Sequence, residues 1–474
     1  MLISKLLKAI DIEYKNQDAD IELITDDSRK CCERSIFICT KKGTDYVNQA
    51  IENGAVLVVS EQALDVNCVV VDDARKAFAV LSAEFFGNCH KSLRLIGVTG
   101  TNGKTTTAEM IHRIISLSGR KCGLVSTVRN TDGDSDKEAS STTPDPFSLH
   151  RIFSEIYHKG GEFCVVECSS QGLDQKRLYG IGFEVAVLTN IGSDHLDYHK
   201  NEESYVSAKK MLFEESEIAV INLDDRYADE FISASKGKVI TYSLKKDEAD
   251  FTAKCIKPGE EGSDYAFVGD SIIHRIKLKI PGEFNISNSM AALCVALRYD
   301  ISLDSAAASL RSFYGVKGRM EVLPVNEEYK VIIDYAHTPE SMRQLLLTVS
   351  AFKKARVIAV FGCGGDRDKQ KRAVMGKTVC EFADIAIVTS DNPRHEDPAD
   401  IIDDILSGME KTQIPVYIRE NREKAVKFAL KIAEKNDIIL LCGKGHETYQ
   451  ITGDEKISFD EREKVLGFIN KMHS

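Results

Sequence analysis

The fold of this chain follows from one stretch, Ile96-Gly97-Val98-Thr99-Gly100-Thr101-Asn102-Gly103-Lys104-Thr105-Thr106-Thr107. An apolar run enters a glycine-rich turn, and apolar residues at helical spacing follow. A strand, such a loop, Lys-Thr and a helix form a phosphate cradle, in which backbone N–H groups and the helix N-terminus face an anion. We expect Lys104 to reach the β- and γ-phosphates of a nucleotide and Thr105 to ligate Mg²⁺. A structural turn is the alternative, and Val98 stands where the full pattern has glycine.

Length and composition limit the possible partners. The 474 residues predict two to four domains at about 150 residues each. A net charge of −11 argues against nucleic acid as a partner. No stretch approaches ~20 apolar residues, so we expect no membrane span. The 13 cysteines include no C-x-x-C pair, which favours free thiols in a reducing cytoplasm over disulfides or zinc.

Strand and helix patterns alternate along the chain and predict an α/β protein of three domains. We expect a small N-terminal α/β domain over residues 1–90. A central P-loop ATPase-like domain with a mostly parallel sheet covers residues 91–315, and a C-terminal Rossmann-like α/β domain covers residues 316–474. The polar segment 129–141 is expected to be an exposed loop, and the compact segment 315–321 is expected to be an inter-domain hinge.

Titratable side chains follow two strands of the central domain. Glu167 ends an apolar run, and a carboxylate at the C-terminal end of a parallel strand beside a phosphate loop suits Mg²⁺. A solvated strand-end glutamate is the alternative. His195 lies in a dense Asp and His cluster after another strand and is a candidate second metal ligand. Spacing alone places Lys209 and Lys210 on a helix surface as solvated charges.

The C-terminal domain presents both charge signs at the ends of its predicted strands. That edge of an open α/β sheet is where ligands bind. The side chains are the cations Arg367, Arg394 and Lys444 and the carboxylates Asp391 and Glu447. Arginines hold a carboxylate and carboxylates hold an ammonium, so an amino acid fits here. An ATP site facing an amino-acid site indicates activation of a carboxylate followed by attack of an amine.

The motifs occur together in an order that resembles the Mur ligases, which add amino acids to the peptidoglycan precursor, and most of all their diaminopimelate-adding members. They are DDSR (26–29), TGTNGKTTT (99–107), STTPD (141–145), ECSS (167–170), DQKR (174–177), TNIGSDHLDYH (189–199), YVSAKKMLF (205–213), FNISN (284–288), GRME (318–321), DYAHTP (334–339), FGCGGDRD (361–368), DNPR (391–394) and GKGHE (443–447). The family shares the valine at position 98.

The resemblance implies site residues position by position. The ATP site matches Gly100, Thr101, Asn102, Gly103, Lys104, Thr105, Thr106, Asn288, Arg319 and Asp334. The UDP-sugar site matches Ser28, Thr142, Thr143, Ser169, Gln175 and Arg177. The amino-acid site matches Arg367, Asp391, Asn392, Pro393, Arg394, Gly443 and Glu447. Magnesium ligands match Glu167 and His195, and Lys209 matches a lysine that carries a carbamate (N6-carboxylysine), against the surface position that its spacing favours.

The function implied by the resemblance is an ADP-forming amide ligation that uses ATP and Mg²⁺. The γ-carboxylate of D-Glu in UDP-N-acetylmuramoyl-L-Ala-D-Glu becomes an acyl phosphate, which the amine of meso-2,6-diaminopimelate attacks. The expected enzyme is a cytoplasmic monomer of peptidoglycan precursor synthesis. Arg394 favours diaminopimelate over lysine because only diaminopimelate has a second carboxylate.

Three alternatives remain open. They are a lysine-adding Mur ligase, a ligase like folylpolyglutamate synthetase and an inactive nucleotide-binding module. Arg394 argues against lysine, and the Asp-Ser-Arg turn at residues 27–29 argues against the folate branch. The intact set of Lys104, Glu167, His195 and Lys209 argues against an inactive module.

Overall fold

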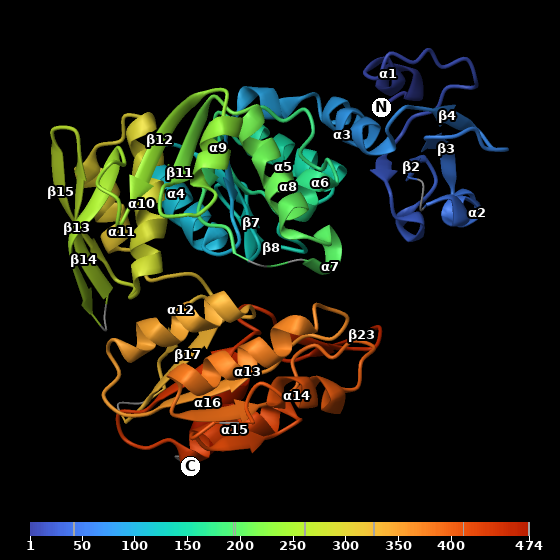
Figure 1. The fold of residues 1–474 in the computed structure, drawn as a ribbon. Coiled ribbons are helices and arrows are strands. Elements are labelled where there is room, and N and C mark those ends of the chain that lie inside the picture. Colours follow the sequence, from blue (N-terminus) through green and yellow to red (C-terminus); the bar gives the residue numbers. More distant parts are fainter. Residues whose placement is uncertain are drawn as a thin grey trace.

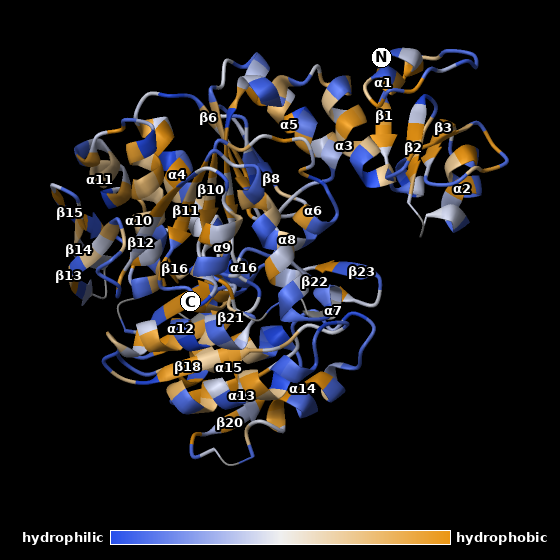
Figure 2. Ribbon diagram, turned by 45° about the horizontal axis from the view of Figure 1, so that its top comes forward, coloured by the Kyte–Doolittle hydropathy of each residue, from blue (hydrophilic) through white to orange (hydrophobic). Residues whose placement is uncertain are grey.

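The computed structural model describes residues 1–474 except 41–42, 193, 195, 260–261, 326–327, 411 and 473–474. Figure 1 shows three bodies that follow one another along the chain, from blue through green and yellow to red. Each of the three is built on its own sheet, of four, eleven and six strands, and a separate two-stranded sheet lies near the C-terminus. In Figure 2 the strands inside each body are hydrophobic, and hydrophilic colour gathers on loops and outer helix faces.

The N-terminal body is a four-stranded parallel sheet with helices on both faces. Its strands are β1 (Leu23–Thr25), β2 (Ser35–Cys39), β3 (Ala55–Ser60) and β4 (Cys68–Val70). Its helices are α1 (Ile3–Lys8), α2 (Val47–Glu52) and α3 (Ala74–Phe85), with short 3₁₀ turns η1 (Ser28–Lys30), η2 (Thr44–Tyr46) and η3 (Cys89–Ser92). Alternate residues of β2 point to opposite faces. Ile36 and Ile38 pack with α1 and α3, whereas Phe37 and Cys39 pack with α2.

The central body has the strand order β15-β14-β13-β12-β11-β10-β5-β9-β6-β7-β8. The strands are β5 (Arg94–Thr99), β6 (Cys122–Val125), β7 (Arg129–Thr131), β8 (Asp136–Glu138), β9 (Phe163–Glu167), β10 (Val185–Leu188), β11 (Ile218–Asn222), β12 (Lys238–Ser243), β13 (Phe251–Gly259), β14 (Gly262–Gly269) and β15 (Ile272–Leu278). Pairing is parallel from β13 to β6 and antiparallel at both edges. The expected mostly parallel sheet is therefore confirmed.

Helices cover both faces of the central sheet. They are α4 (Lys104–Leu117), α5 (Pro146–His158), α6 (Ser170–Asp174), α7 (Leu196–His199), α8 (Glu202–Glu214), α9 (Ala228–Ala234), α10 (Glu283–Arg298) and α11 (Leu303–Arg311). One core joins the sheet to α4, α10 and α11, and a second core joins it to α5, α8 and α9. Neighbouring residues of β5 belong to different cores, since Ile96 lies in the first core and Leu95 in the second.

One expectation about the central body was wrong, and the start of α10 was not marked by the sequence. The segment 129–141 is not only an exposed loop, since β7 and β8 form a hairpin that extends the sheet beside β6. Its turn is fixed by buried Asp132, which accepts the N–H groups of Asp134 and Ser135 at 3.0 and 2.9 Å. Asn288 does not cap its helix, because α10 begins at Glu283 and places Asn288 in the second turn. The β7–β8 hairpin and the start of α10 are both polar, so no apolar periodicity in the sequence predicted them.

The C-terminal body has the strand order β16-β17-β21-β18-β19-β20, parallel except for the edge strand β16. Its strands are β16 (Glu321–Leu323), β17 (Lys330–Asp334), β18 (Val357–Phe361), β19 (Ile385–Val388), β20 (Val416–Ile418) and β21 (Ile438–Cys442), with the separate hairpin β22 (Tyr449–Thr452) and β23 (Glu455–Ser458). Its helices are α12 (Pro339–Ser350), α13 (Gln370–Phe382), α14 (Pro398–Leu406), α15 (Arg422–Ile432) and α16 (Glu461–Met472). The first three lie on one face and the last two on the other, as a Rossmann-like sheet requires. Among the described helices, none has the length and apolar composition needed to cross a bilayer.

A buried pair of histidines joins η3 to α5, and it predicts a pH dependence of stability. The rings of His90 and His150 lie 4.8 Å apart, and burial lowers their pKa values from 6.5 to about 4 and about 3. Below pH 6.5 both imidazole rings bind a proton in the unfolded chain. In the folded chain they stay neutral until the pH approaches their lowered pKa values. Stability is therefore full above pH 6.5 and falls as the pH drops toward 4, by up to about 1.4 kcal/mol per pH unit for each ring.

Calorimetric Tm values measured between pH 7 and 4.5 check this prediction. The double variant His90→Gln/His150→Gln should have a flatter profile than the wild type. An unchanged slope would show that other groups cause the acid sensitivity.

Candidate active site

The glycine-rich loop joins β5 to α4 and needs glycine at two positions. Gly100 and Gly103 have φ angles of +144° and +82°, which residues with a side chain rarely adopt. A Cβ on Gly100 would lie 1.9 Å from Oγ1 of Thr189, and one on Gly103 would lie 2.4 Å from Oδ1 of Asn288. Asn288 therefore lies against the loop, as the resemblance implies. The first N–H groups of α4 remain available to an anion.

The remaining loop residues are held by the segment directly after β10 and by α8. The backbone N–H of Thr101 donates to the carbonyl of Asn190 at 2.7 Å, and the N–H of Asn102 donates to Oδ1 of the same residue at 3.1 Å. The hydroxyls of Thr101 and Tyr205 are 2.9 Å apart. Thr106 is buried in the first turn of α4. The loop is thus a rigid cradle before any nucleotide enters.

Lys104 lies folded over the loop. Its Nζ donates to the carbonyl oxygens of Gly100 at 3.0 Å and Thr101 at 2.8 Å. Burial lowers the pKa of Lys104, and the negative charges of Glu167 and Asp194 oppose this shift. An ammonium held this way by neutral carbonyls is ready to meet an anionic phosphate.

Glu167 at the end of β9 is buried and hydrogen-bonded, so the alternative of a solvated glutamate is wrong. Its Oε1 accepts the backbone N–H of Thr127 at 2.9 Å, and its Oε2 accepts the hydroxyls of Thr127 and Thr105, each at 3.1 Å. Burial raises the pKa of Glu167, while Lys104 acts in the opposite direction. A carboxylate beside the Thr105 hydroxyl is a set of hard oxygen donors that fits Mg²⁺. Sequence reasoning missed Thr127, although it follows a strand end next to Glu167.

The second predicted metal ligand, His195, lies outside the described residues. Over the described chain, no group of three or more His, Cys, Asp or Glu side chains is arranged to hold a metal ion. Asp194 is described, and its carboxylate approaches the site from the same segment. It acts on the pKa values of both Lys104 and Lys209. Sequence reasoning had placed Asp194 only within a polar cluster.

Lys209 is buried, with 1% of its surface exposed, so the surface position favoured by spacing is wrong. Its Nζ donates to the Gly100 carbonyl at 2.8 Å and lies 4.7 Å from the centre of the Tyr205 ring. Burial, with Lys104 nearby, drives the pKa of Lys209 well below its ordinary value. Lys210 is the residue nearer the surface and pairs with Glu230 at 2.9 Å. Burial therefore favours the uncharged form of this amine, which is the nucleophilic form.

Arg319 and Asp334 approach the loop from the C-terminal body. The guanidinium of Arg319 lies over the ring of Tyr335 at 4.4 Å, and its charge lowers the pKa of Lys104. Asp334 is enclosed by backbone donors, since its carboxylate accepts the N–H groups of Met320 and Ala336, both at 2.7 Å. Asn288 and Arg319 thus lie at the loop, and Asp334 lies beside Arg319.

The predicted sugar-site residues of the central body form one hydrogen-bonded cluster beside Glu167. The Thr143 hydroxyl donates to the Glu167 carbonyl at 2.7 Å and accepts the N–H of Ser169 at 3.0 Å. Arg177 donates to the Thr143 carbonyl at 2.6 Å and to Oε1 of Gln175 at 2.7 and 3.1 Å. The Thr142 hydroxyl accepts from Thr127 at 3.0 Å and completes the cluster.

Ser28 lies in the N-terminal body, where its hydroxyl donates to Oε1 of Gln49 at 2.6 Å. Its turn faces the cluster, because the charges of Asp145 and Arg177 act on the pKa of Asp26, which burial raises. An ion pair between Lys176 and Asp73 joins the two bodies at this place. The structure thus brings the two parts of the predicted sugar site toward each other.

The predicted amino-acid residues surround a fully buried lysine that sequence reasoning noted only as a cation. Nζ of Lys444 lies 3.1 Å from Asp391 and 3.3 Å from Glu447, and it also donates to the side chain of Asn392. Nδ2 of Asn392 donates to Glu447 at 3.0 Å. Gly443 has a φ of +102°, and a Cβ there would lie 2.6 Å from Oδ2 of Asp391. Lys444 thus holds these carboxylates as a rigid unit.

Two arginines stand at the edge of this unit. Arg394 has a φ of +52°, and its Nη1 donates to the Gly365 carbonyl at 2.7 Å. Burial lowers the pKa of Arg394, and the charge of Arg367 lowers it further. A Cβ on Gly365 would lie 1.8 Å from the Pro393 carbonyl oxygen, so this glycine lets the two segments meet. Two like charges held together favour a shared anionic ligand.

Two family profiles match long segments of this chain. The profile of the Mur ligase middle domain matches residues 98–296, and that of the Mur ligase glutamate ligase domain matches residues 318–445. The chain belongs to the Mur ligase family. It is therefore an ATP-dependent ligase with the family's α/β architecture. The predicted fold class and the predicted enzyme class are both confirmed.

Curated relatives resemble this Mur ligase over its whole length. UDP-N-acetylmuramoyl-L-alanyl-D-glutamate--2,6-diaminopimelate ligase 1 of Clostridium acetobutylicum is 40% identical, with 99% of this chain and 100% of the relative covered. The corresponding ligase of Clostridium perfringens is 42% identical, with 99% of each chain covered. A solved structure of such a ligase is 33% identical, with a TM-score of 0.70 and all of both chains covered.

A more distant neighbour shares the fold alone. The MurF ligase of Thermotoga maritima, solved in complex with ADP, is 21% identical to this Mur ligase, with a TM-score of 0.67. The alignment covers 95% of this chain and 97% of the MurF chain.

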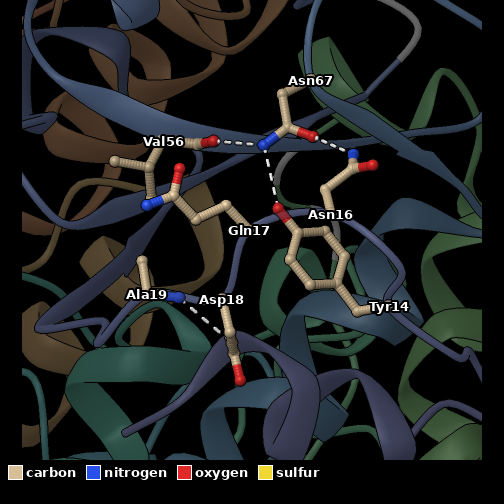
Figure 3. Close-up of a pocket in the computed structure, with 7 residues that line it drawn as sticks. All are labelled: Tyr14, Asn16, Gln17, Asp18, Ala19, Val56 and Asn67. Atoms are coloured by element: carbon tan, nitrogen blue, oxygen red, sulfur yellow. Dashed lines mark hydrogen bonds between the residues drawn. The ribbon is translucent and has the colours of Figure 1, made fainter.

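A hollow of about 450 Å³ on the N-terminal body lies apart from all these residues (Figure 3). Asn67 Nδ2 donates to the Val56 carbonyl at 2.7 Å and to the Tyr14 hydroxyl at 3.0 Å, and Asn16 donates to Asn67 at 2.9 Å. These lining groups satisfy one another. The hollow contains none of the candidate site residues of this Mur ligase.

Proposed function

We propose that this Mur ligase joins meso-2,6-diaminopimelate to the D-Glu γ-carboxylate of UDP-N-acetylmuramoyl-L-Ala-D-Glu, forming ADP and phosphate. One observation carries the choice of amino acid. The guanidinium groups of Arg394 and Arg367 stand together at the edge of the Asp391–Lys444–Glu447 unit. The unit presents negative charge to an ammonium, and the arginines present positive charge to a carboxylate. Lysine has no second carboxylate for the arginine pair, whereas diaminopimelate has one.

We propose that the loop of residues 100–106, with Asn288, Arg319 and Asp334, binds ATP. Lys104 directs the γ-phosphate toward the substrate carboxylate. The carboxylate oxygen attacks the γ-phosphorus, the bond to ADP breaks, and an acyl phosphate results. The amine of diaminopimelate then attacks the acyl carbon, loses a proton, and phosphate departs from the tetrahedral intermediate. Lys104 and Arg319 stabilise the charge that develops on the transferred group.

Thr105, Glu167 and His195 are proposed to hold Mg²⁺. When bound, the ion neutralises phosphate charge and aligns the phosphate oxygens. The support is the oxygen donor pair of Thr105 and Glu167, 3.1 Å apart. Lys209 is proposed to carry a carbamate, formed when its neutral amine adds to carbon dioxide. The support is the burial that holds the pKa of Lys209 low.

The three bodies are proposed to divide the substrates among them. Residues 1–90, with Thr142, Thr143, Ser169, Gln175 and Arg177 of the central body, hold the UDP-sugar. Residues 91–315 hold ATP, and residues 316–474 hold the amino acid. We infer a cytoplasmic monomer that uses neither membrane nor nucleic acid as a partner. The support is that one chain supplies every proposed contact, and its 13 cysteines are free thiols.

An amino-acid-dependent phosphate-release assay tests this proposal. The purified enzyme is given ATP, Mg²⁺ and the UDP-muramoyl dipeptide, with diaminopimelate, lysine or no amino acid. Release should require diaminopimelate, remain near background with lysine, and stop when EDTA removes the metal. In buffer freed of carbon dioxide the rate should fall and bicarbonate should restore it, if Lys209 carries a carbamate. Equal release with lysine would identify a lysine-adding ligase, and no release with either amino acid would support an inactive module.

A further inference from the structure

Arg462 in the first turn of α16 connects two segments that lie far apart in the sequence. Its Nε donates to Oε1 of Glu321 at 2.8 Å, and its Nη2 donates to the other carboxylate oxygen. Nη2 also lies 3.3 Å from the carbonyl oxygen of Gly445. The Arg462 side chain is 13% exposed. One planar guanidinium thus holds the start of β16 and the loop of residues 443–447 together.

Glu321 also contacts the linker between the central and C-terminal bodies. Its Oε2 accepts the backbone N–H of Gly318 at 2.6 Å. Gly318 directly precedes Arg319, the proposed nucleotide contact. The position of Arg319 therefore depends on a carboxylate that Arg462 orients.

The linker and the amino-acid loop touch at this point. A Cβ on Gly318 would lie 2.2 Å from the carbonyl carbon of Gly445, and a Cβ on Gly445 would lie 2.7 Å from Cβ of Tyr335. Tyr335 is the residue whose ring lies under Arg319. The contact leaves no room for side chains, so a small shift of the loop must move the linker.

Arg462 is not needed to anchor α16. Buried Glu461 accepts from Arg422 at 2.8 Å, and Lys464 pairs with Glu423 at 2.8 Å. Both contacts join α16 to α15 without Arg462. A cation in the first turn also opposes the helix dipole, so Arg462 gives α16 no intrinsic stability. Its position is explained by the groups it connects.

We infer that Arg462 is a positioning residue that couples the nucleotide site to the amino-acid site. It fixes Arg319, through Glu321 and Gly318, relative to the loop that contains Gly443 and Glu447. The inference rests on the proposed function for the identity of the two ligands. Lysine cannot replace arginine here, because a single ammonium cannot hold both oxygens of Glu321 and reach the Gly445 carbonyl.

The test compares Arg462→Lys and Glu321→Gln with the control Lys464→Ala, which removes a contact of the same helix outside both sites. Arg462→Lys should raise KM for both ATP and diaminopimelate about tenfold, as expected for loss of a coupling between sites. The double variant should be no worse than the more impaired single variant, since both remove one interaction. Lys464→Ala should keep wild-type KM values. Unchanged KM values in Arg462→Lys, or fully additive effects in the double variant, would overturn the inference.

Hydrogen exchange gives a readout that does not depend on the reaction. Arg462→Lys should speed amide exchange in both segments 315–321 and 443–447, while Lys464→Ala leaves both unchanged. If only α16 exchanges faster, Arg462 has a merely structural role and the inference fails. If the wild-type enzyme does not ligate diaminopimelate, the proposed function fails, and the exchange result still decides whether Arg462 connects the two segments.

Discussion

Lys104→Ala is expected to lower kcat/KM for phosphate release by about 10³-fold, the loss that follows removal of one preorganised charge-stabilising group. The ammonium is held over the loop by the carbonyls of Gly100 and Thr101, at 3.0 and 2.8 Å. Lys209 also donates to the Gly100 carbonyl, and burial holds its pKa well below the ordinary lysine value. Burial therefore disfavours a charge on Lys209 that could replace the charge of Lys104. Initial rates of phosphate release at saturating amino acid measure the effect.

Lys210→Ala is the matched control for this experiment. Lys210 is paired with Glu230 near the surface, so its removal should leave the rate within about twofold of the wild type. Circular dichroism of both variants establishes that they are folded. Substantial turnover by folded Lys104→Ala would remove the basis for a phosphate-binding loop.

Arg394→Ala is expected to raise KM for diaminopimelate about 100-fold and to change KM for ATP by less than about threefold. Truncating one partner of a buried charge pair costs about 2–5 kcal/mol, which corresponds to this range. The ATP loop makes no described contact with Arg394, so nucleotide binding should be spared. The ratio of kcat/KM for diaminopimelate to that for lysine should fall, because only diaminopimelate loses a partner.

Arg394 has a φ of +52°, a conformation that strains arginine and alanine alike, so the alanine variant adds no backbone strain. Arg394→Asn is a second test, because asparagine tolerates this conformation better and cannot hold a carboxylate as arginine does. It should match the alanine variant in KM for diaminopimelate. Arg419→Ala is the control, since the half-buried Arg419 stacks on Phe428 at 4.3 Å and is not among the candidate site residues. Equal loss of ATP and diaminopimelate binding in Arg394→Asn would contradict the proposed role.

Sequence reasoning predicted the elements that apolar runs mark. The strands that end at Glu167, Asp334 and Cys442 follow short apolar stretches bounded by polar or glycine residues, and the structure places them as expected. Ligand-facing residues could also be predicted, because the C-terminal ends of parallel strands meet at one edge. This reasoning found Glu167, Asp391 and Glu447 before any contact was known.

The other features could not be predicted, because their sequences show no apolar periodicity. Lys209 has a polar side chain, and only the resemblance indicated a special role for it. The structure shows that it faces the core beside Tyr205. The first two turns of α10 contain buried Asn285 and Asn288, which a hydrophobic pattern cannot place. The hairpin of β7 and β8 has polar side chains at a sheet edge. Lys444 was noted only as a cation, because two of its three side-chain partners, Asp391 and Asn392, lie some 50 residues away in the sequence.

The start of α10 also determines where the C-terminal body can pivot. Phe284 packs into the core of that body, and Thr348 of α12 would lie 3.1 Å from a Cβ on Gly282. Asn288, one helical turn beyond Phe284, touches the phosphate loop. If the C-terminal body rotates while Phe284 stays in place, the rotation axis passes through Phe284. That point lies about 6 Å along the helix from Asn288. Phosphates bound at the loop, as proposed, would lie close to the axis, where displacement is small, and the proposed amino-acid pocket, farther from the axis, would move through a larger arc.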